Sequence, residues 1–219
     1  DAMAEASAIP PALGESSGEE PAGTNDEVWW QGFALRVTHR SPWLETLLLG
    51  SPLQWELLRA QEPSLVIRPD QTMPKALCSI LVGLEETEAG WRGFEIALEL
   101  AQHTRATLTG VCAVDTSWVR GTQIGPYYYP GRVEAALQEG YRLLQHAGAV
   151  SLGVGVRFRG RLVEGRLAAA LLQMARKDQE YQLVAVGLEG KSWVGRLMRG
   201  GWVRHTVRWS TIPVLVVGR

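Results

Sequence analysis

Short apolar runs alternate with amphipathic stretches along the C-terminal part of the chain. The apolar runs predict buried strands at Ala76–Leu84, Ala106–Val114, Gln182–Val186 and Ile212–Val217, and a short alternating run predicts one more at Val154–Phe158. Apolar residues at helical spacing predict helices at Gly90–Gln102, Arg132–His146 and Gly165–Ala175. Strands that alternate with helices form right-handed crossovers and a parallel sheet. We therefore expect an α/β fold, an open parallel sheet with helices on both faces.

The segment before this pattern repeats part of it. Residues 33–68 align without gaps on residues 183–218, at an offset of 150. The matching residues include Trp43 and Trp193, Leu47 and Leu197, Gly50 and Gly200, and Pro63, Leu65 and Val66 with Pro213, Leu215 and Val216. Each copy has the pattern of a strand, a glycine-containing loop, a helix and an apolar strand after a proline. We predict that residues 29–70 are a partial β-α-β copy of the main domain, which spans residues 74–219.

Charge is divided unevenly along the chain. Residues 1–28 hold seven of the 23 acids and none of the 22 bases, and their prolines and glycines break any period. This composition predicts a flexible acidic linker or tail. The remainder carries 22 bases against 16 acids, a balance too weak to indicate nucleic acid as a partner. No apolar run approaches the roughly 20 residues that cross a bilayer, so we expect no direct membrane insertion.

The chain has two cysteines, Cys78 and Cys112, and both lie in apolar runs. We expect buried, reduced cysteines in strands, because a zinc site needs more ligands at metal spacing and the four histidines are scattered. Reduced thiols favour a cytoplasmic compartment.

A glycine-rich stretch follows the strand that ends at Val186. Gly187 and Gly190 let the backbone turn tightly and approach a ligand, and Gly200 with Gly201 opens the next helix. The free N–H groups and the positive dipole end of a helix N-terminus suit a phosphate. The spacing favours a nucleotide site, and glycines that only keep the turn compact are the alternative.

This stretch resembles the nucleotide-binding signature of the universal stress protein family: glycine, two residues, glycine, nine residues, glycine, then serine or threonine. Gly187, Gly190 and Gly200 fill the glycine positions, and Gly201 stands where the family has its hydroxyl. The resemblance covers about residues 75–219. It implies a Rossmann-like, five-stranded parallel sheet, binding of an adenine nucleotide (ATP or AMP) without catalysis, and dimers joined through the last strand.

The resemblance also assigns parts of the nucleotide to residues at the carboxyl ends of the strands. Adenine and ribose would lie near the residues that end the first two strands of the main domain, and the phosphates near the glycine-rich stretch. The expected site residues are Leu84, Glu85, Val114, Gly187, Gly190, Lys191, Gly200 and Gly201.

Some residues depart from the family's pattern. Glu85 is one methylene longer than the aspartate of ATP-binding members, and Gly201 lacks the hydroxyl that helps to hold phosphate. Glu86 and Glu189 would bring negative charge near a polyphosphate. Lys191, Arg196 and Arg199 could offset this charge. Whether magnesium takes part is left open.

Catalytic patterns are missing from the sequence. It contains no Gly-x-x-x-x-Gly-Lys-Ser/Thr loop, no His-x-Gly-His pattern and no serine in a nucleophile elbow, so we expect no enzyme. Glu85, Glu86 and Glu88 could supply a catalytic carboxylate pair, but we expect them in a solvated loop and helix start, where acids favour the helix dipole. Arg157, Arg159 and Arg161 are expected on a solvent-facing strand edge, because little aromatic interleaving accompanies them.

Two functions remain open. One is a sensor that binds an adenine nucleotide. The other is an interaction module that binds none, such as the cytoplasmic regulatory tail of a transporter, since domains of this family occur as such fusions. In either case Leu65–Ile67 and Val214–Val217 are predicted to lie near each other as last strands of the two copies, so that the N-terminal copy forms half of a built-in pseudo-dimer.

Overall fold

The computed structural model describes residues 34–37, 63–114, 130–177, 180–188 and 201–218. The predicted flexible tail at residues 1–28 lies outside these ranges, as does most of the N-terminal copy.

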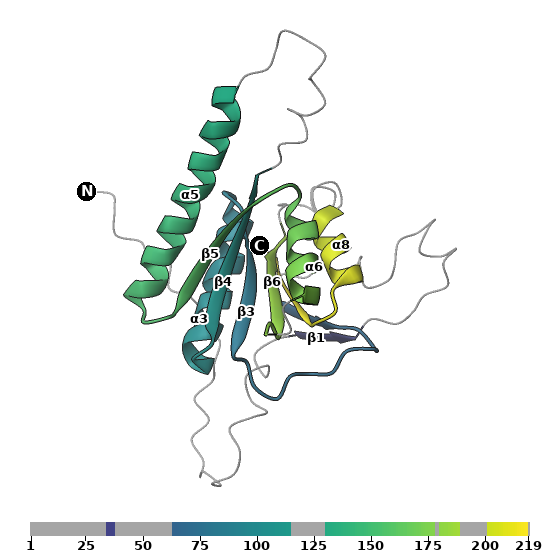
Figure 1. Cartoon of the computed structure of the whole chain (residues 1–219). Coiled ribbons are helices and arrows are strands. Elements are labelled where there is room, and N and C mark those ends of the chain that lie inside the picture. Colours follow the sequence, from purple (N-terminus) through teal and green to yellow (C-terminus); the bar gives the residue numbers. More distant parts are fainter. Residues whose placement is uncertain (1–33, 38–62, 115–129, 178–179, 189–200, 219) are drawn as a thin grey trace, which may run out of the picture.

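The described strands form one sheet in the order β1-β2-β7-β6-β3-β4-β5 (Figure 1). Their bounds are β1 Ala34–Val37, β2 Ser64–Ile67, β3 Ser79–Leu84, β4 Thr107–Val114, β5 Phe158–Glu164, β6 Leu183–Gly187 and β7 Val214–Val217. All neighbours run parallel except β2 and β7, which are antiparallel. The main domain thus has the expected five parallel strands. The whole sheet of the described residues has seven and is mixed, because β2 extends it beyond β7.

Helices cover both faces of the sheet, as predicted. Their bounds are α3 Glu88–Thr104, α5 Pro130–Gly153, α6 Leu167–Lys177 and α8 Gly201–Trp209. Helices α3 and α5 pack on one face and α6 and α8 on the other (Figure 1). Thr87 caps the start of α3, where its hydroxyl accepts the N–H of Gly90 at 3.0 Å. Arg105 ends α3 in the left-handed conformation, with a φ of 57°.

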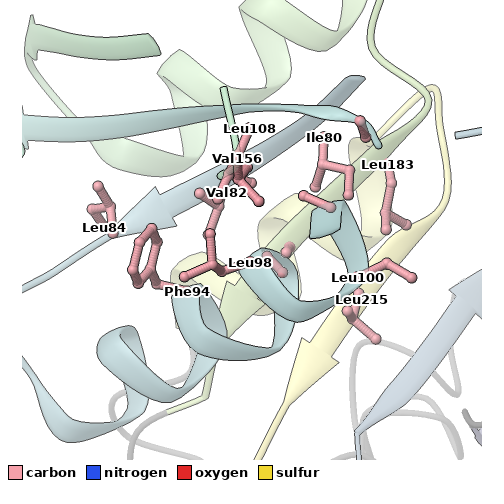
Figure 2. Close-up of a cluster of buried hydrophobic side chains, with 14 of the residues drawn as sticks. Ile80, Val82, Leu84, Phe94, Leu98, Leu100, Leu108, Val156, Leu183 and Leu215 are labelled. Atoms are coloured by element: carbon pink, nitrogen blue, oxygen red, sulfur yellow. The ribbon is translucent and has the colours of Figure 1, made fainter. Parts of the chain in front are cut away.

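Alternate residues of the central strands supply the two cores. In β3, Ile80, Val82 and Leu84 join the core under α3, whereas Leu81 joins the core under α6 and α8. Figure 2 shows Phe94 of α3 beside the side chains of β3, and Phe94 is fully buried. A strand that is covered on both faces needs apolar residues at every position, which explains why it stands out as a continuous apolar run.

The prediction for the strand after α5 is wrong in its bounds. In place of a strand at Val154–Phe158, α5 continues to Gly153 and β5 follows a turn at Gly155. The φ of 77° at Gly155 favours glycine. Because β5 is an edge strand with mostly exposed residues, it produces no apolar run in the sequence.

The three arginines of this region lie where they were predicted. Arg157, Arg159 and Arg161 are all exposed along the edge of the sheet, and Arg159 pairs with Glu180 at 3.5 Å. Charged side chains on an edge strand hinder its pairing with another chain.

The prediction that both cysteines are buried holds for one of them. Cys112 is buried in β4, but Cys78 is exposed. Cys78 precedes the first residue of β3, and its backbone N–H donates to the side chain of Gln182 at 3.1 Å. It therefore lies at the rim of the sheet, just before β3 begins.

The two predicted last strands lie side by side, as expected. β2 and β7 pair antiparallel, with Leu65 opposite Leu215. The interpretation of residues 29–70 as a partial copy still rests on the sequence and stays a prediction.

Candidate functional site at the carboxyl ends of the strands

The carboxyl ends of β3 and β6 lie next to each other. The two strands pair in parallel, with Ile80 opposite Leu183 and Val82 opposite Ala185. The chain leaves β3 through α3 on one face and reaches β6 through α6 on the other. Ligands of open α/β sheets bind where the connections reverse in this way. The predicted site lies at this switch point.

Three of the predicted residues come from the ends of β3 and β4. Leu84 ends β3 and is only 2% exposed, and Glu85 follows it half-buried. Val114 ends β4, and its carbonyl accepts the N–H of Gly165 at 2.8 Å. Since Leu84 lies opposite Cys112 in the parallel ladder, all three predicted residues share one edge of the sheet.

The thiol of Cys112, which lies beneath this edge, is expected to react poorly. Burial raises the pKa of Cys112 above its ordinary value, and the negative charge of Glu85 raises it further. The helix α5 packs over the thiol at Gly140, where an added Cβ would lie 3.3 Å from the Cys112 Sγ. A covered, protonated thiol is a poor nucleophile.

Gly187 ends β6 in direct contact with the start of α3. A Cβ on Gly187 would lie 2.8 Å from the backbone nitrogen of Gly90 and closer still to the carbonyl oxygen of Ala89. A Cβ on Gly93 would lie 2.9 Å from the nitrogen of Gly187. No side chain fits between these backbones. Close packing of α3 on β6 therefore accounts for Gly187 without a ligand. The Gly90-x-x-Gly93 spacing is the sequence signal for this contact.

Gly201 lies open at the start of α8. It is exposed, and the nearest contact of an added Cβ among the described residues would be Arg204 Nη2 at 4.0 Å. The Nε of Arg204 is buried and has no hydrogen-bond partner among the described residues. Free N–H groups, the helix dipole and a nearby guanidinium together suit an anion. Sequence reasoning missed Arg204, although a base one turn after a Gly-Gly helix start is a usable signal.

Part of the predicted set of site residues lies at the carboxyl-end edge of the sheet. α8 runs from the carboxyl end of β6 back to the amino end of β7, so its N-terminus and Gly201 lie at the same edge as Gly187 and Glu85. Gly190, Lys191 and Gly200 fall outside the described residues.

Two further features bear on function. Within the described ranges, no cluster of three or more His, Cys, Asp or Glu side chains is arranged to hold a metal ion. In the same ranges, no helix has the length and apolar character needed to cross a membrane.

The arrangement is that of a Rossmann-like, doubly wound α/β domain with an anion-compatible helix start at its switch point. The chain belongs to the universal stress protein family, whose family model matches residues 79–218. A comparison with curated proteins found no match.

Solved structures share this fold. A universal stress protein from Archaeoglobus fulgidus is 17% identical with a TM-score of 0.62, and the alignment covers 85% of this chain and 60% of that one. A member of the family from Burkholderia pseudomallei is 29% identical with a TM-score of 0.51, covering 64% of this chain and 94% of that one. A universal stress protein in complex with cAMP is 22% identical with a TM-score of 0.51, covering 65% and 97% respectively.

Proposed function

We propose that this chain is a non-catalytic regulatory domain that binds an adenine nucleotide, ATP or AMP, at the carboxyl ends of β3 and β6. The observation that carries the proposal is the start of α8, where an added Cβ on exposed Gly201 would lie 4.0 Å from Arg204 Nη2, while the buried Nε of the same guanidinium has no hydrogen-bond partner among the described residues. Membership of the family and the solved relative in complex with cAMP support the class of ligand.

In this proposal the two ends of the nucleotide meet different parts of the edge. Adenine and ribose lie near Leu84, Glu85 and Val114, and the Glu85 carboxylate accepts a hydrogen bond from a hydroxyl or amine of the nucleoside. The phosphates meet the first N–H groups of α8 and the guanidinium of Arg204. Magnesium, where needed, would arrive with the polyphosphate, since the described residues hold no metal-binding cluster.

Binding without hydrolysis is part of the proposal. Its support is the sequence, which has no Gly-x-x-x-x-Gly-Lys-Ser/Thr loop and no His-x-Gly-His pattern. A cytoplasmic setting also belongs to the proposal, because Cys78 and Cys112 are both free.

The sharpest test places a charge at Gly201. Gly201→Asp should favour the helix, because a carboxylate at a helix N-terminus is stabilising, yet it should repel a phosphate. We expect at least about a tenfold loss of ATP affinity, which corresponds to about 1.4 kcal/mol, measured by titration calorimetry with and without magnesium. Gly201→Asn is the matched neutral control and should lose less. Equal affinities of the Asp and Asn variants would contradict a phosphate at this helix.

A complementary variant restores the family's hydroxyl. Gly201→Ser adds a donor at the helix start and should tighten ATP binding several-fold, because a hydroxyl can hydrogen bond a phosphate oxygen. Gly200→Val should abolish binding by blocking the approach of the ligand to the backbone. Persistent binding in Gly200→Val would contradict the site.

The second candidate function is an interaction module that binds no nucleotide, such as the regulatory tail of a transporter. The observation in its favour is that packing against Ala89 and Gly90 explains Gly187 without a ligand. The same titration decides between the two functions. No heat of binding for ATP or AMP at millimolar concentration would support the interaction module.

A further inference from the structure

The two helical layers of the sheet carry opposite charge. Helices α6 and α8 together hold four bases and no acid, whereas α3 and α5 together hold five acids and three bases. The four bases are Arg176 and Lys177 in the last turn of α6, and Arg204 and Arg208 in α8. Because α6 and α8 lie side by side on one face of the sheet, their positive charge is gathered on one surface (Figure 1).

The exposed part of this surface lies where the two helices end, and we call it the basic face. It consists of Arg176, Lys177, Arg208 and Trp209, all of which are exposed. The Arg176 Nη2 donates to the carbonyl oxygen of Trp209 at 3.4 Å, which joins the end of α6 to the end of α8. The Arg208 guanidinium lies over the Trp209 ring, 5.4 Å from its centroid. A guanidinium that stacks on a ring keeps the N–H groups at its edge, where a carboxylate can accept them.

The cations of the basic face have no acidic partners in the described part of the chain. The helix dipole favours a base near the end of each helix, and this accounts for each cation separately. Arg176, Lys177 and Arg208 nevertheless form no ion pair with a described residue, although Arg159 at the edge of the sheet pairs with Glu180. Neighbouring cations repel each other, so an anion on this face would be stabilising.

The chain itself contains a segment of the complementary charge. Residues 1–28 hold seven acids and no base. Five residues separate the segment from Ala34, where β1 begins. The chain therefore carries its own polyanion, joined to the sheet at β1.

The point of attachment lies near the basic face. β1 pairs with β2, and β2 pairs with β7. Val66 of β2 lies in the same core as Val207 of α8, so α8 covers this end of the sheet. Strands lie about 4.8 Å apart, which places β1 about 10 Å from β7. A flexible chain of 28 residues spans about 30 Å on average, and the acids of the segment are thus within reach of the basic face.

We propose that residues 1–28 dock on the basic face, with their carboxylates accepting hydrogen bonds from Arg176, Lys177 and Arg208. A single exposed ion pair contributes little. The attachment to β1 holds the segment at an effective concentration of about a millimolar, so several weak pairs form within one chain. The docked segment covers cations that would otherwise attract an outside polyanion, such as an anionic membrane or a nucleic acid.

The test is cross-linking of the full chain with a carbodiimide, which joins a lysine amine directly to a neighbouring carboxylate. Trypsin leaves residues 1–36 as one peptide, because Arg36 is the first base of the chain. Links from Lys177 to this peptide are counted by mass spectrometry. Lys75 is the matched control, because it is equally exposed and lies outside the two helices. A mixture of ¹⁵N-labelled and unlabelled protein separates links within one molecule from links between two.

We expect links from Lys177 to be several-fold more abundant than links from Lys75 at low salt. They should fall several-fold when the salt is raised from 0.01 M to 1 M, because the Debye length shortens from about 30 Å to about 3 Å. An equal yield from Lys177 and Lys75 overturns the proposal and leaves the basic face to an outside polyanion, lipid or nucleic acid. Links that mostly join labelled to unlabelled molecules overturn it in favour of a second copy.

A pair of charge variants tests the face itself. Arg176→Gln with Arg208→Gln should lower the yield of Lys177 links several-fold at low salt. Arg92→Gln with Arg142→Gln removes the same charge from the other helical layer and should leave the yield unchanged. Equal yields in the two double variants overturn the proposal. Circular dichroism checks the fold, and if the first variant fails to fold, the comparison of Lys177 with Lys75 in the wild type decides.

Discussion

Replacing Gly187 by alanine tests whether α3 rests directly on the end of β6. The added methyl would lie 2.8 Å from the nitrogen of Gly90 and closer still to the carbonyl oxygen of Ala89. Both neighbours are backbone atoms in the first turn of α3, which Thr87 caps, so they cannot turn away as a flexible side chain would. The whole start of α3 has to move away from the sheet.

The expected cost follows from overpacking of a core. Inserting a methyl into a well-packed interior costs about 1–3 kcal/mol and occasionally more. Because rigid backbone opposes the methyl, we expect about 3 kcal/mol for Gly187→Ala. At roughly 2–4 °C per kcal/mol for a chain of this size, the melting temperature should fall by about 6–12 °C.

The assay is urea and thermal unfolding followed by circular dichroism. Gly131→Ala is the matched control, because Gly131 lies in the first turn of α5, and an added Cβ would meet no described residue outside its own helix within 4 Å. This control should be neutral or slightly stabilising, by up to about 1 kcal/mol. If Gly187→Ala lowers the free energy of unfolding by less than about 1 kcal/mol, the packing explanation is refuted and a role of Gly187 in ligand binding is favoured.

The remaining predictions concern the core, the β2 attachment and the thiols. Phe94→Ala should cost about 3–5 kcal/mol in urea unfolding, because its ring is fully buried and packs against two other aromatic rings. Arg68→Ala should cost about 1 kcal/mol, because the Arg208 carbonyl loses this donor while the Ser210 carbonyl keeps its bond from the Gln71 side chain, and an unchanged unfolding midpoint would contradict this. Iodoacetamide should label exposed Cys78 and spare Cys112 in the folded protein, as read by mass spectrometry. The raised pKa of Cys112 means that the folded state favours the neutral thiol. The resulting contribution to the free energy of unfolding is fully present below the ordinary pKa of 9.0 and is lost as the pH rises above that value. Glu85→Gln should reduce that alkaline loss, and an identical pH profile in the variant would contradict the coupling.

Local sequence patterns determined most of the sheet, and the internal repeat together with the family resemblance predicted one long-range contact. β3, β4, β6 and β7 were predictable because strands covered on both faces need apolar residues at nearly every position. The offset of 150 made β2 and β7 equivalent, and the family resemblance, which implies pairing through the last strand, predicted that they meet. Leu84 and Val114 were placed at one edge because parallel strands end on the same side.

Other features were decided only by the tertiary structure. β5 lies at an edge and is mostly exposed, so its residues carry no apolar signal, and its bounds came from pairing with β4. The role of Gly187 depends on Ala89, a residue far away in the sequence, and the Gly90-x-x-Gly93 spacing by itself does not report which distant backbone it will pack against. Cys78 lies in an apolar run yet is exposed, because the buried strand β3 begins only at the next residue, Ser79. Local patterns report which residues must be covered, whereas the packing of distant segments decides what covers them.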